Sequence, residues 1–223
     1  MLTLHHLTNS RSFRILWLLE ELVWSYDINY QLITHERTPS YLAPDELTQI
    51  HPMGKAPILV DDGRALVESG FIMEYLLKKY DQENQFKPTD EQAWQDYTFW
   101  LHFAESSMMP PLVMRLVMTA VATKSPWFIR PIARKIAQKV ESLVIAGNIR
   151  RSFGLLDDTL AKSAYVAGSM FSAADIQVYF GAKALQNRGG LSDYPNVERW
   201  LKTCEGRLAY KSACQKGGAL FES

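Results

Sequence analysis

The 223-residue sequence predicts an α/β domain followed by an all-helical domain. Up to residue 80, short apolar runs of strand length alternate with segments of helical periodicity, whereas after residue 90 only long segments of helical periodicity remain. Residues 81–89 between them are polar and contain Pro88, which is typical of a linker. We therefore expect an α/β domain at 1–80, a linker at 81–89 and a helical domain at 90–223.

The first domain should begin with a strand, a helix and a second strand. Residues 2–7 alternate well enough for a strand, and residues 8–12 form a polar break. From Phe13 to residue 22 the sequence reads as a mostly buried helix, and residues 26–33 read as the second strand. A helix between two strands implies a parallel pair with a right-handed crossover.

A hairpin and a helix should complete this domain. Residues 58–60 and 65–67 are apolar and flank the turn Asp61-Asp62-Gly63-Arg64, which is a hairpin pattern. Apolar residues then recur at helical spacing over 71–80. One β-α-β unit followed by a β-β-α unit is the order of a thioredoxin-like domain.

The junction between the hairpin and its helix has chemical meaning. A helix start leaves N–H groups unpaired and bears a partial positive charge, so the backbone at Ser69 can hold a carboxylate. Glu68 beside it can pair with an ammonium group. Together they fit the head group of an amino acid, although Ser69 acting only as a helix cap is the alternative.

A proline precedes the hairpin. The Ala56-Pro57 bond stands at the mouth of a strand, where an X-Pro bond can be cis. A cis bond would turn the Ala56 backbone away from the sheet. Its N–H and C=O groups could then pair with an extended ligand that binds like an additional strand.

The second domain should contain only helices. Helical spacing extends over residues 90–123, 126–161, 173–188 and 195–206, and Pro110-Pro111 should kink or restart the first of these helices.

The start of the helix expected at 173–188 carries a capping motif. Ser172 is followed three residues later by Asp175, a variant of the capping box, and we expect it to serve folding rather than chemistry.

The composition limits the classes of function. The chain is 47% apolar and 22% charged, and its 24 basic residues balance 24 acidic ones, so no overall field attracts nucleic acid or an anionic membrane. There is no apolar run of about 18 residues and no secretion signal at the start. Cys204 and Cys214 lack metal-ligand and disulfide patterns. We expect a cytoplasmic protein that binds small molecules, without a metal, a nucleic acid or a membrane.

Several of these motifs together resemble one family. The sequence Gly54-Lys55-Ala56-Pro57-Ile58-Leu59, the pair Glu68-Ser69, the chain start and the capping motif resemble the cytosolic glutathione S-transferase superfamily over nearly the whole chain. The turn Asn9-Ser10-Arg11 looks most like the fungal and bacterial transferases that have an Asn-Ser-Arg turn after the first strand.

The resemblance implies a detoxifying homodimer that conjugates glutathione, its co-substrate, to hydrophobic electrophiles. Two alternatives remain open: a glutathione-dependent peroxidase or disulfide reductase, and a non-catalytic interaction protein with the transferase fold.

The resemblance also places the catalytic group in the turn after the first strand. A cysteine thiol has a pKa of about 8.5, so the thiolate needs stabilising donors. Ser10 can donate an O–H and Asn9 an N–H, and we expect Ser10 to act, with Asn9 as the close competitor. The alternative is that Asn9, Ser10 and Ser12 only cap the helix. The turn contains no Cys or Tyr.

The remaining predicted site residues hold the two substrates. For glutathione, Arg37 and Lys55 are cations for its glycine carboxylate, with Ala56, Pro57, Glu68 and Ser69 along the rest of the molecule. Glu105 is a further candidate for the ligand amine, from the partner subunit. The second substrate should lie between the domains against apolar side chains. The candidates are Met108, Met109, Leu112, Phe128 and Tyr179.

Overall fold

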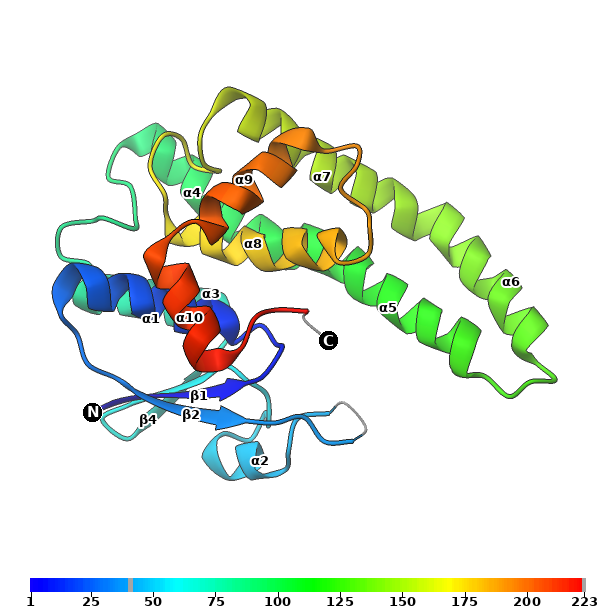
Figure 1. Ribbon diagram of the computed structural model, residues 1–223, viewed down its shortest axis with the longest axis horizontal. Coiled ribbons are helices and arrows are strands. Elements are labelled where there is room, and N and C mark those ends of the chain that lie inside the picture. The colour runs from blue at the N-terminus through cyan, green and yellow to red at the C-terminus, as the bar shows by residue number, and fades with distance from the viewer. Residues whose placement is uncertain (40–41, 222–223) are drawn as a thin grey trace.

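A four-stranded mixed sheet forms the first part of the chain in the computed structural model, which describes residues 1–39 and 42–221 (Figure 1). The strands lie in the order β2-β1-β3-β4. Strand β1 pairs parallel with β2 and antiparallel with β3, and β3 pairs antiparallel with β4. This is the predicted thioredoxin-like arrangement. The strands are β1 (Leu2–Leu7), β2 (Gln31–His35), β3 (Ile58–Asp61) and β4 (Arg64–Val67).

Three helices belong to this sheet. They are α1 (Phe13–Tyr26), α2 (Glu46–Ile50) and α3 (Ser69–Tyr80). The strand predicted at 26–33 was wrong in its first half, because α1 continues to Tyr26. Asp27 then ends the helix in the left-handed conformation, with φ 49°, and the strand starts only at Gln31.

The rest of the chain is helical, as predicted. The proline pair lies in the first turn of α5, where a missing N–H costs nothing, and the turn before it is π-helical. A second π-helical turn interrupts the helix predicted at 126–161. The elements are α4 (Glu91–Phe103), η1 (Ala104–Met108), α5 (Met109–Lys124), α6 (Arg130–Val140), η2 (Glu141–Ile145), α7 (Ala146–Lys162), α8 (Ala173–Gln186), α9 (Pro195–Glu205) and α10 (Leu208–Gly217).

The capping motif is present at the start of α8, and Asp175 does more than cap. Its carboxylate is fully buried and accepts hydrogen bonds from the backbone N–H groups of Val166 (3.0 Å) and Ser172 (2.9 Å) and from Trp200 Nε1 (3.0 Å). Burial raises the pKa of Asp175 to about 6, although these donors favour its charged form. One carboxylate thus joins α8, α9 and the loop after α7.

Helix α10, which periodicity did not predict, returns the chain to the first domain and packs on α1 (Figure 1). Glu20 of α1 accepts hydrogen bonds from Lys216 Nζ (2.7 Å), from Ser212 and from Tyr30. Burial raises the pKa of Glu20, but these hydrogen bonds outweigh burial and lower the pKa below its ordinary value.

The lowered pKa of Glu20 predicts an acid-dependent loss of stability. Its contribution is full above the ordinary pKa of 4.5 and is lost as the pH falls through the lower folded-state value. Glu20→Gln should therefore lower the free energy of unfolding by about 1 to 3 kcal/mol near neutral pH, and by less in acid. Urea unfolding of both proteins over pH tests this prediction, which fails if the difference between them stays constant into acid.

Candidate active site between the two domains

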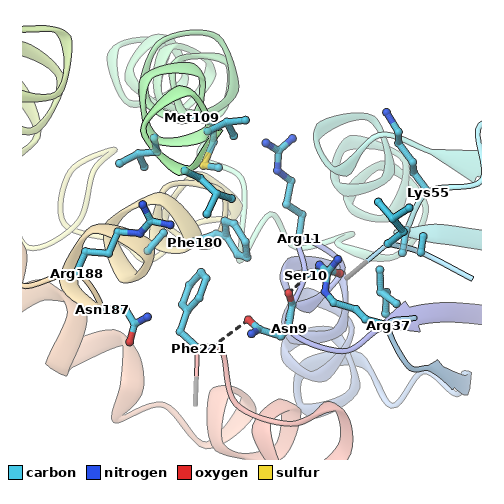
Figure 2. Close-up of a pocket in the computed structure, with 18 residues that line it drawn as sticks. Asn9, Ser10, Arg11, Arg37, Lys55, Met109, Phe180, Asn187, Arg188 and Phe221 are labelled. Atoms are coloured by element: carbon cyan, nitrogen blue, oxygen red, sulfur yellow. Dashed lines mark hydrogen bonds between the residues drawn. The ribbon is translucent and has the colours of Figure 1, made fainter. Parts of the chain in front are cut away.

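Asn9 begins the turn between β1 and α1. Its φ of 49° lies in the left-handed region, which Asn tolerates better than most residues. Arg37 Nη2 donates to the Asn9 carbonyl over 3.0 Å, and Asn9 Oδ1 accepts from the Phe221 N–H over 3.1 Å (Figure 2). Because the Phe221 N–H is a donor, the oxygen of the Asn9 amide must face it. The NH₂ group of Asn9 is therefore left as a donor for another partner.

Ser10 is the first hydroxyl of a buried chain that leads to His6. Ser10 Oγ lies 2.8 Å from Ser12 Oγ, which lies 2.8 Å from His6 Nδ1, and His6 Nε2 lies 3.0 Å from the carbonyl oxygen of Gly217 in α10. Ser12 Oγ also accepts from the Leu7 N–H over 3.0 Å. These hydrogen-bonded side chains connect the turn after β1 to helix α10.

The direction of the protons in this chain follows from its two ends. The Gly217 carbonyl only accepts, so His6 Nε2 must donate to it. Burial lowers the pKa of His6 more than its hydrogen bonds raise it, so the ring is neutral and Nδ1 accepts from Ser12 Oγ. Ser12 Oγ can then accept the Ser10 hydroxyl hydrogen. In this arrangement Ser10 presents a lone pair to the cavity, while the NH₂ group of Asn9 has no hydrogen-bond partner among the described residues.

The capping alternative for these residues fits only in part. Ser12 occupies the N-cap position of α1, but its side chain does not cap the helix and bonds instead to Leu7 and His6. Ser10 Oγ accepts from the Ser12 N–H over 3.2 Å. The turn is thus held by side-chain bonds to β1 rather than by helix capping.

A cavity of about 480 Å³ opens in front of this turn, between the two domains. Figure 2 shows its two sides: polar residues of the first domain face apolar and polar residues of the helical domain. The lining residues that the argument uses are Asn9, Ser10, Arg11, Arg37, Lys55 and Ala56 on the first side, and Met109, Leu112, Val113, Leu116, Phe180 and Phe221 on the second.

A smaller cavity of about 160 Å³ adjoins the first, between the loop that precedes β3 and the start of α3. It is lined by Pro57, Glu68 and Ser69, and it shares Arg11, Lys55 and Ala56 with the larger cavity. All eight residues predicted for glutathione and catalysis therefore line one or both cavities. The Ala56-Pro57 bond is cis.

Ser69 is not the N-cap residue of α3, which was the alternative to a role in binding. Glu68, with φ 72°, is the N-cap residue, and Ser69 is the first residue of the helix and is buried. The backbone N–H of Ser69 is one of the N–H groups at the helix start that have no partner within the helix. Glu68 and Ser69 thus both lie at the wall of the smaller cavity.

Glu105 of this same chain also lines the smaller cavity. It forms an ion pair with Arg11 over 3.0 Å and another with the buried Arg14. Burial lowers the pKa of Arg14, and Glu105 opposes that effect. The carboxylate of Glu105 is thus held at the cavity wall by two cations from α1 and the turn before it.

The five residues predicted for the apolar wall lie in different surroundings. Met109 and Leu112 line the larger cavity, whereas Met108, the last residue of η1, is fully buried in the core. Tyr179 is also buried, and its hydroxyl is hydrogen-bonded to Glu205 and Tyr210. Phe128 lies in the connection between α5 and α6 and is 65% exposed, away from both cavities. Helical periodicity finds apolar residues but does not tell which face meets a cavity.

The sequence reasoning missed several lining residues. Val113 and Leu116 follow Met109 at helical spacing. Because Met109 was predicted at the cavity, the same spacing would have predicted these two residues on the same face of α5. Phe221 and Arg188 had no local signal, because only the folded chain brings the C-terminus to the first turn. Among the described residues, no group of His, Cys, Asp or Glu side chains is arranged to hold a metal ion.

Comparisons with known proteins give one consistent result. Residues 1–78 match the family model described as glutathione S-transferase, N-terminal domain, and residues 111–207 match glutathione S-transferase, C-terminal domain. Glutathione S-transferase 3 of Schizosaccharomyces pombe is 37% identical over 97% of this chain and 88% of its own length. Glutathione S-transferase 1 of Saccharomyces cerevisiae is 30% identical over 99% of this chain and 97% of its own length.

Among solved structures, a glutathione S-transferase from Actinobacillus pleuropneumoniae superimposes with a TM-score of 0.81 at 29% identity. The match covers 100% of this chain and 95% of that one.

Proposed function

The chain belongs to the cytosolic glutathione S-transferase superfamily, and we propose that its two adjoining cavities hold glutathione and a hydrophobic electrophile. The protein is a glutathione transferase, with glutathione as its co-substrate. The observation that carries the assignment of the site is the continuity of the cavities, which share Arg11, Lys55 and Ala56. We further propose that residues 81–89, which contain no helix or strand, are the linker between a glutathione-binding domain at 1–80 and a substrate-binding domain at 90–223.

Glutathione fits this path in one direction. Its amino-acid head group would lie in the smaller cavity, with the carboxylate at the start of α3 and the ammonium group beside Glu68. The middle of the molecule would pass the Ala56 backbone, which forms no hydrogen bond with another described residue. The glycine carboxylate would then meet Lys55 and Arg37, and the cysteine sulfur would reach the turn at Asn9 and Ser10.

The turn would stabilise the thiolate by hydrogen bonding. Lowering a thiol pKa by about two units requires roughly 2.7 kcal/mol of preference for the anion. The Asn9 NH₂ group is a free donor, and Ser10 can donate once its hydrogen turns from Ser12 towards the cavity. The thiolate would attack an electrophilic carbon held against Met109, Leu112 and Leu116 of α5, so that a C–S bond forms and the leaving group departs.

The positions of the cysteines disfavour a disulfide reductase that works through a mixed disulfide with an enzyme cysteine. Cys204 is buried, and burial raises its pKa. Neither Cys204 nor Cys214 lines the two cavities. A mixed disulfide between glutathione and an enzyme cysteine would therefore have no partner at this turn.

We also propose that the Asn-Ser-Arg turn groups the chain with fungal and bacterial transferases, as its two yeast relatives support.

Lys55→Gln tests the placement of glutathione. Lys55 has no hydrogen-bond or ion-pair partner among the residues that the structure describes, so its charge is available to the glycine carboxylate. The variant should raise KM for glutathione by about tenfold to a hundredfold with little change in kcat, because this contact is made equally in the ground and transition states. Steady-state kinetics with a soluble electrophile measure the effect, and Lys211→Gln on α10 is the matched control.

A glutathione ester makes this test specific. Glutathione monoethyl ester lacks the charge of the glycine carboxylate, so the wild type should bind it more weakly than glutathione. The Lys55→Gln variant should discriminate much less between the two compounds. Equal discrimination by both proteins would place the glycine carboxylate elsewhere.

We propose that the protein is a homodimer, as the resemblance implied. Phe71 of α3 is 49% exposed and Phe99 of α4 is 46% exposed, and such large apolar side chains are suited to an interface. Phe99→Ser should shift the dimer towards monomer in sedimentation velocity, while Leu208→Ser, at a more exposed apolar site on α10, should not. A wild type that sediments as a monomer at micromolar concentration would contradict the proposal.

A further inference from the structure

The end of the helical domain that lies farthest from the sheet has an unusual surface. Helices α5 and α6 run side by side away from the body of the protein, as Figure 1 shows, and we call residues 113–140 the arm. Trp127, in the connection between the two helices, is 80% exposed, and Ile132 and Ile136 of α6 are 62% and 53% exposed. Soluble proteins rarely leave such apolar groups together on the surface without a function.

Helix α6 presents its larger apolar residues outward. Its small residues Ala133 and Ala137 are buried, whereas Ile132 and Ile136, four residues apart, form an exposed apolar stripe. A helix that served only the core would have the larger side chains inside. The exposed stripe therefore needs a partner other than α5.

The charges of the arm are of one sign. Residues 113–140 contain six basic residues and no acidic residue, although the whole chain has 24 of each; one of the six, Arg115, pairs with Glu141 just beyond the arm. Lys135 and Lys139 each follow a residue of the apolar stripe by three positions, so they lie next to it on the helix surface. Both are exposed, and among the described residues neither has an ion-pair partner. The balanced total charge concealed this local excess.

We propose that the arm binds the surface of an anionic lipid bilayer. Apolar side chains flanked by lysines, with a tryptophan at the tip, have the chemistry that interfacial helices use: the apolar groups enter the headgroup region and the cations meet anionic lipids. None of the described helices is long and apolar enough to cross a membrane, so the contact is with the surface. Two arms of the same charge repel each other, which disfavours a second copy as the occupant.

This surface would bring the electrophile site close to lipid. Helix α5 runs from the larger cavity, which it lines with Leu112, Val113 and Leu116, into the arm. An apolar electrophile dissolved in the bilayer would thus reach the cavity along one apolar helix. This consequence depends on the proposed active site, but the binding of the arm to lipid does not.

Cosedimentation of the full chain with vesicles tests the proposal. Binding is expected to vesicles of phosphatidylcholine mixed with phosphatidylserine, and much less to phosphatidylcholine alone, and it should weaken as salt is added. Trp127→Ser/Ile132→Ser should weaken binding by about a hundredfold, and Lys135→Gln/Lys139→Gln by about thirtyfold. Conjugation of a soluble electrophile should stay unchanged in both variants, which shows that they fold.

Matched changes elsewhere serve as controls. Trp24→Ser removes another exposed tryptophan, which is 64% exposed on α1, and Lys162→Gln/Lys211→Gln removes two exposed lysines outside the arm. These variants should bind vesicles like the wild type. The proposal is overturned if the wild type does not bind anionic vesicles or if the control variants lose as much binding as the arm variants. It is also overturned if the arm variants change self-association in sedimentation without lipid, which would assign the surface to a second copy.

Discussion

Asp175→Ala is expected to lower the free energy of unfolding by about 3 to 5 kcal/mol. The substitution leaves the backbone N–H groups of Val166 and Ser172 and the indole N–H of Trp200 without an acceptor in a fully buried place. Each unsatisfied donor costs about 1 to 3 kcal/mol. Because these donors belong to α9, the start of α8 and the loop before it, the loss should weaken the packing of the whole helical domain.

Two other variants separate this network from ordinary helix capping. Asp90 caps α4 at an exposed position by accepting from the Ala93 N–H over 3.1 Å, so Asp90→Ala should cost only about 1 kcal/mol. Asp175→Asn keeps one acceptor oxygen but directs an NH₂ group at donors, and it should fall between the two. Urea unfolding followed by circular dichroism gives all three values. A loss in Asp175→Ala no larger than that in Asp90→Ala would show that the buried network adds nothing.

Asn9→Asp is expected to lower kcat/KM by about a hundredfold to a thousandfold. The substitution preserves the size of the side chain, an oxygen for the Phe221 N–H and a residue type that accepts the left-handed backbone. It replaces the free NH₂ group with a negatively charged oxygen that repels a thiolate. The loss should appear mainly in kcat, because a raised thiol pKa leaves less of the bound glutathione ionised at neutral pH.

Ser10→Ala distinguishes the two candidates in the turn. The hydroxyl hydrogen of Ser10 is directed to Ser12, whose own hydrogen is directed to His6, so Ser10 must reorient before it can donate to sulfur. If Asn9 is the main donor, Ser10→Ala should lose less activity than Asn9→Asp. A loss in Ser10→Ala as large as that in Asn9→Asp, with Asn9→Ala nearly as active as wild type, would assign the main role to Ser10.

Local sequence patterns predicted those features whose causes are local. The hairpin at 58–67 follows from a turn between two apolar runs, and the capping motif at Ser172 follows from the spacing of two side chains. The corner at Glu68 and Ser69 was predictable for the same reason, since three consecutive elements of the chain place it. Such features need no knowledge of what packs against them.

Features that depend on distant neighbours were not predictable in this way. Helix α10 is short and has mixed polarity, and it is stable because it packs on α1, almost two hundred residues earlier. Tyr179 was predicted for the apolar wall of the cavity, but its ring is buried in the core and its hydroxyl bonds to Glu205 and Tyr210. The proton direction at Ser10 likewise depends on Gly217, at the far end of the chain.

The central claim is that glutathione binds with its thiol ionised at the turn of Asn9 and Ser10. The most direct measurement is the ultraviolet absorbance of the thiolate in the glutathione complex as a function of pH, with calorimetry to establish that the site is filled. The account predicts a thiol pKa well below the ordinary value of about 8.5 in the wild type, and a return to that value or above it in Asn9→Asp. Glutathione that binds to the wild type with an ordinary thiol pKa would contradict it.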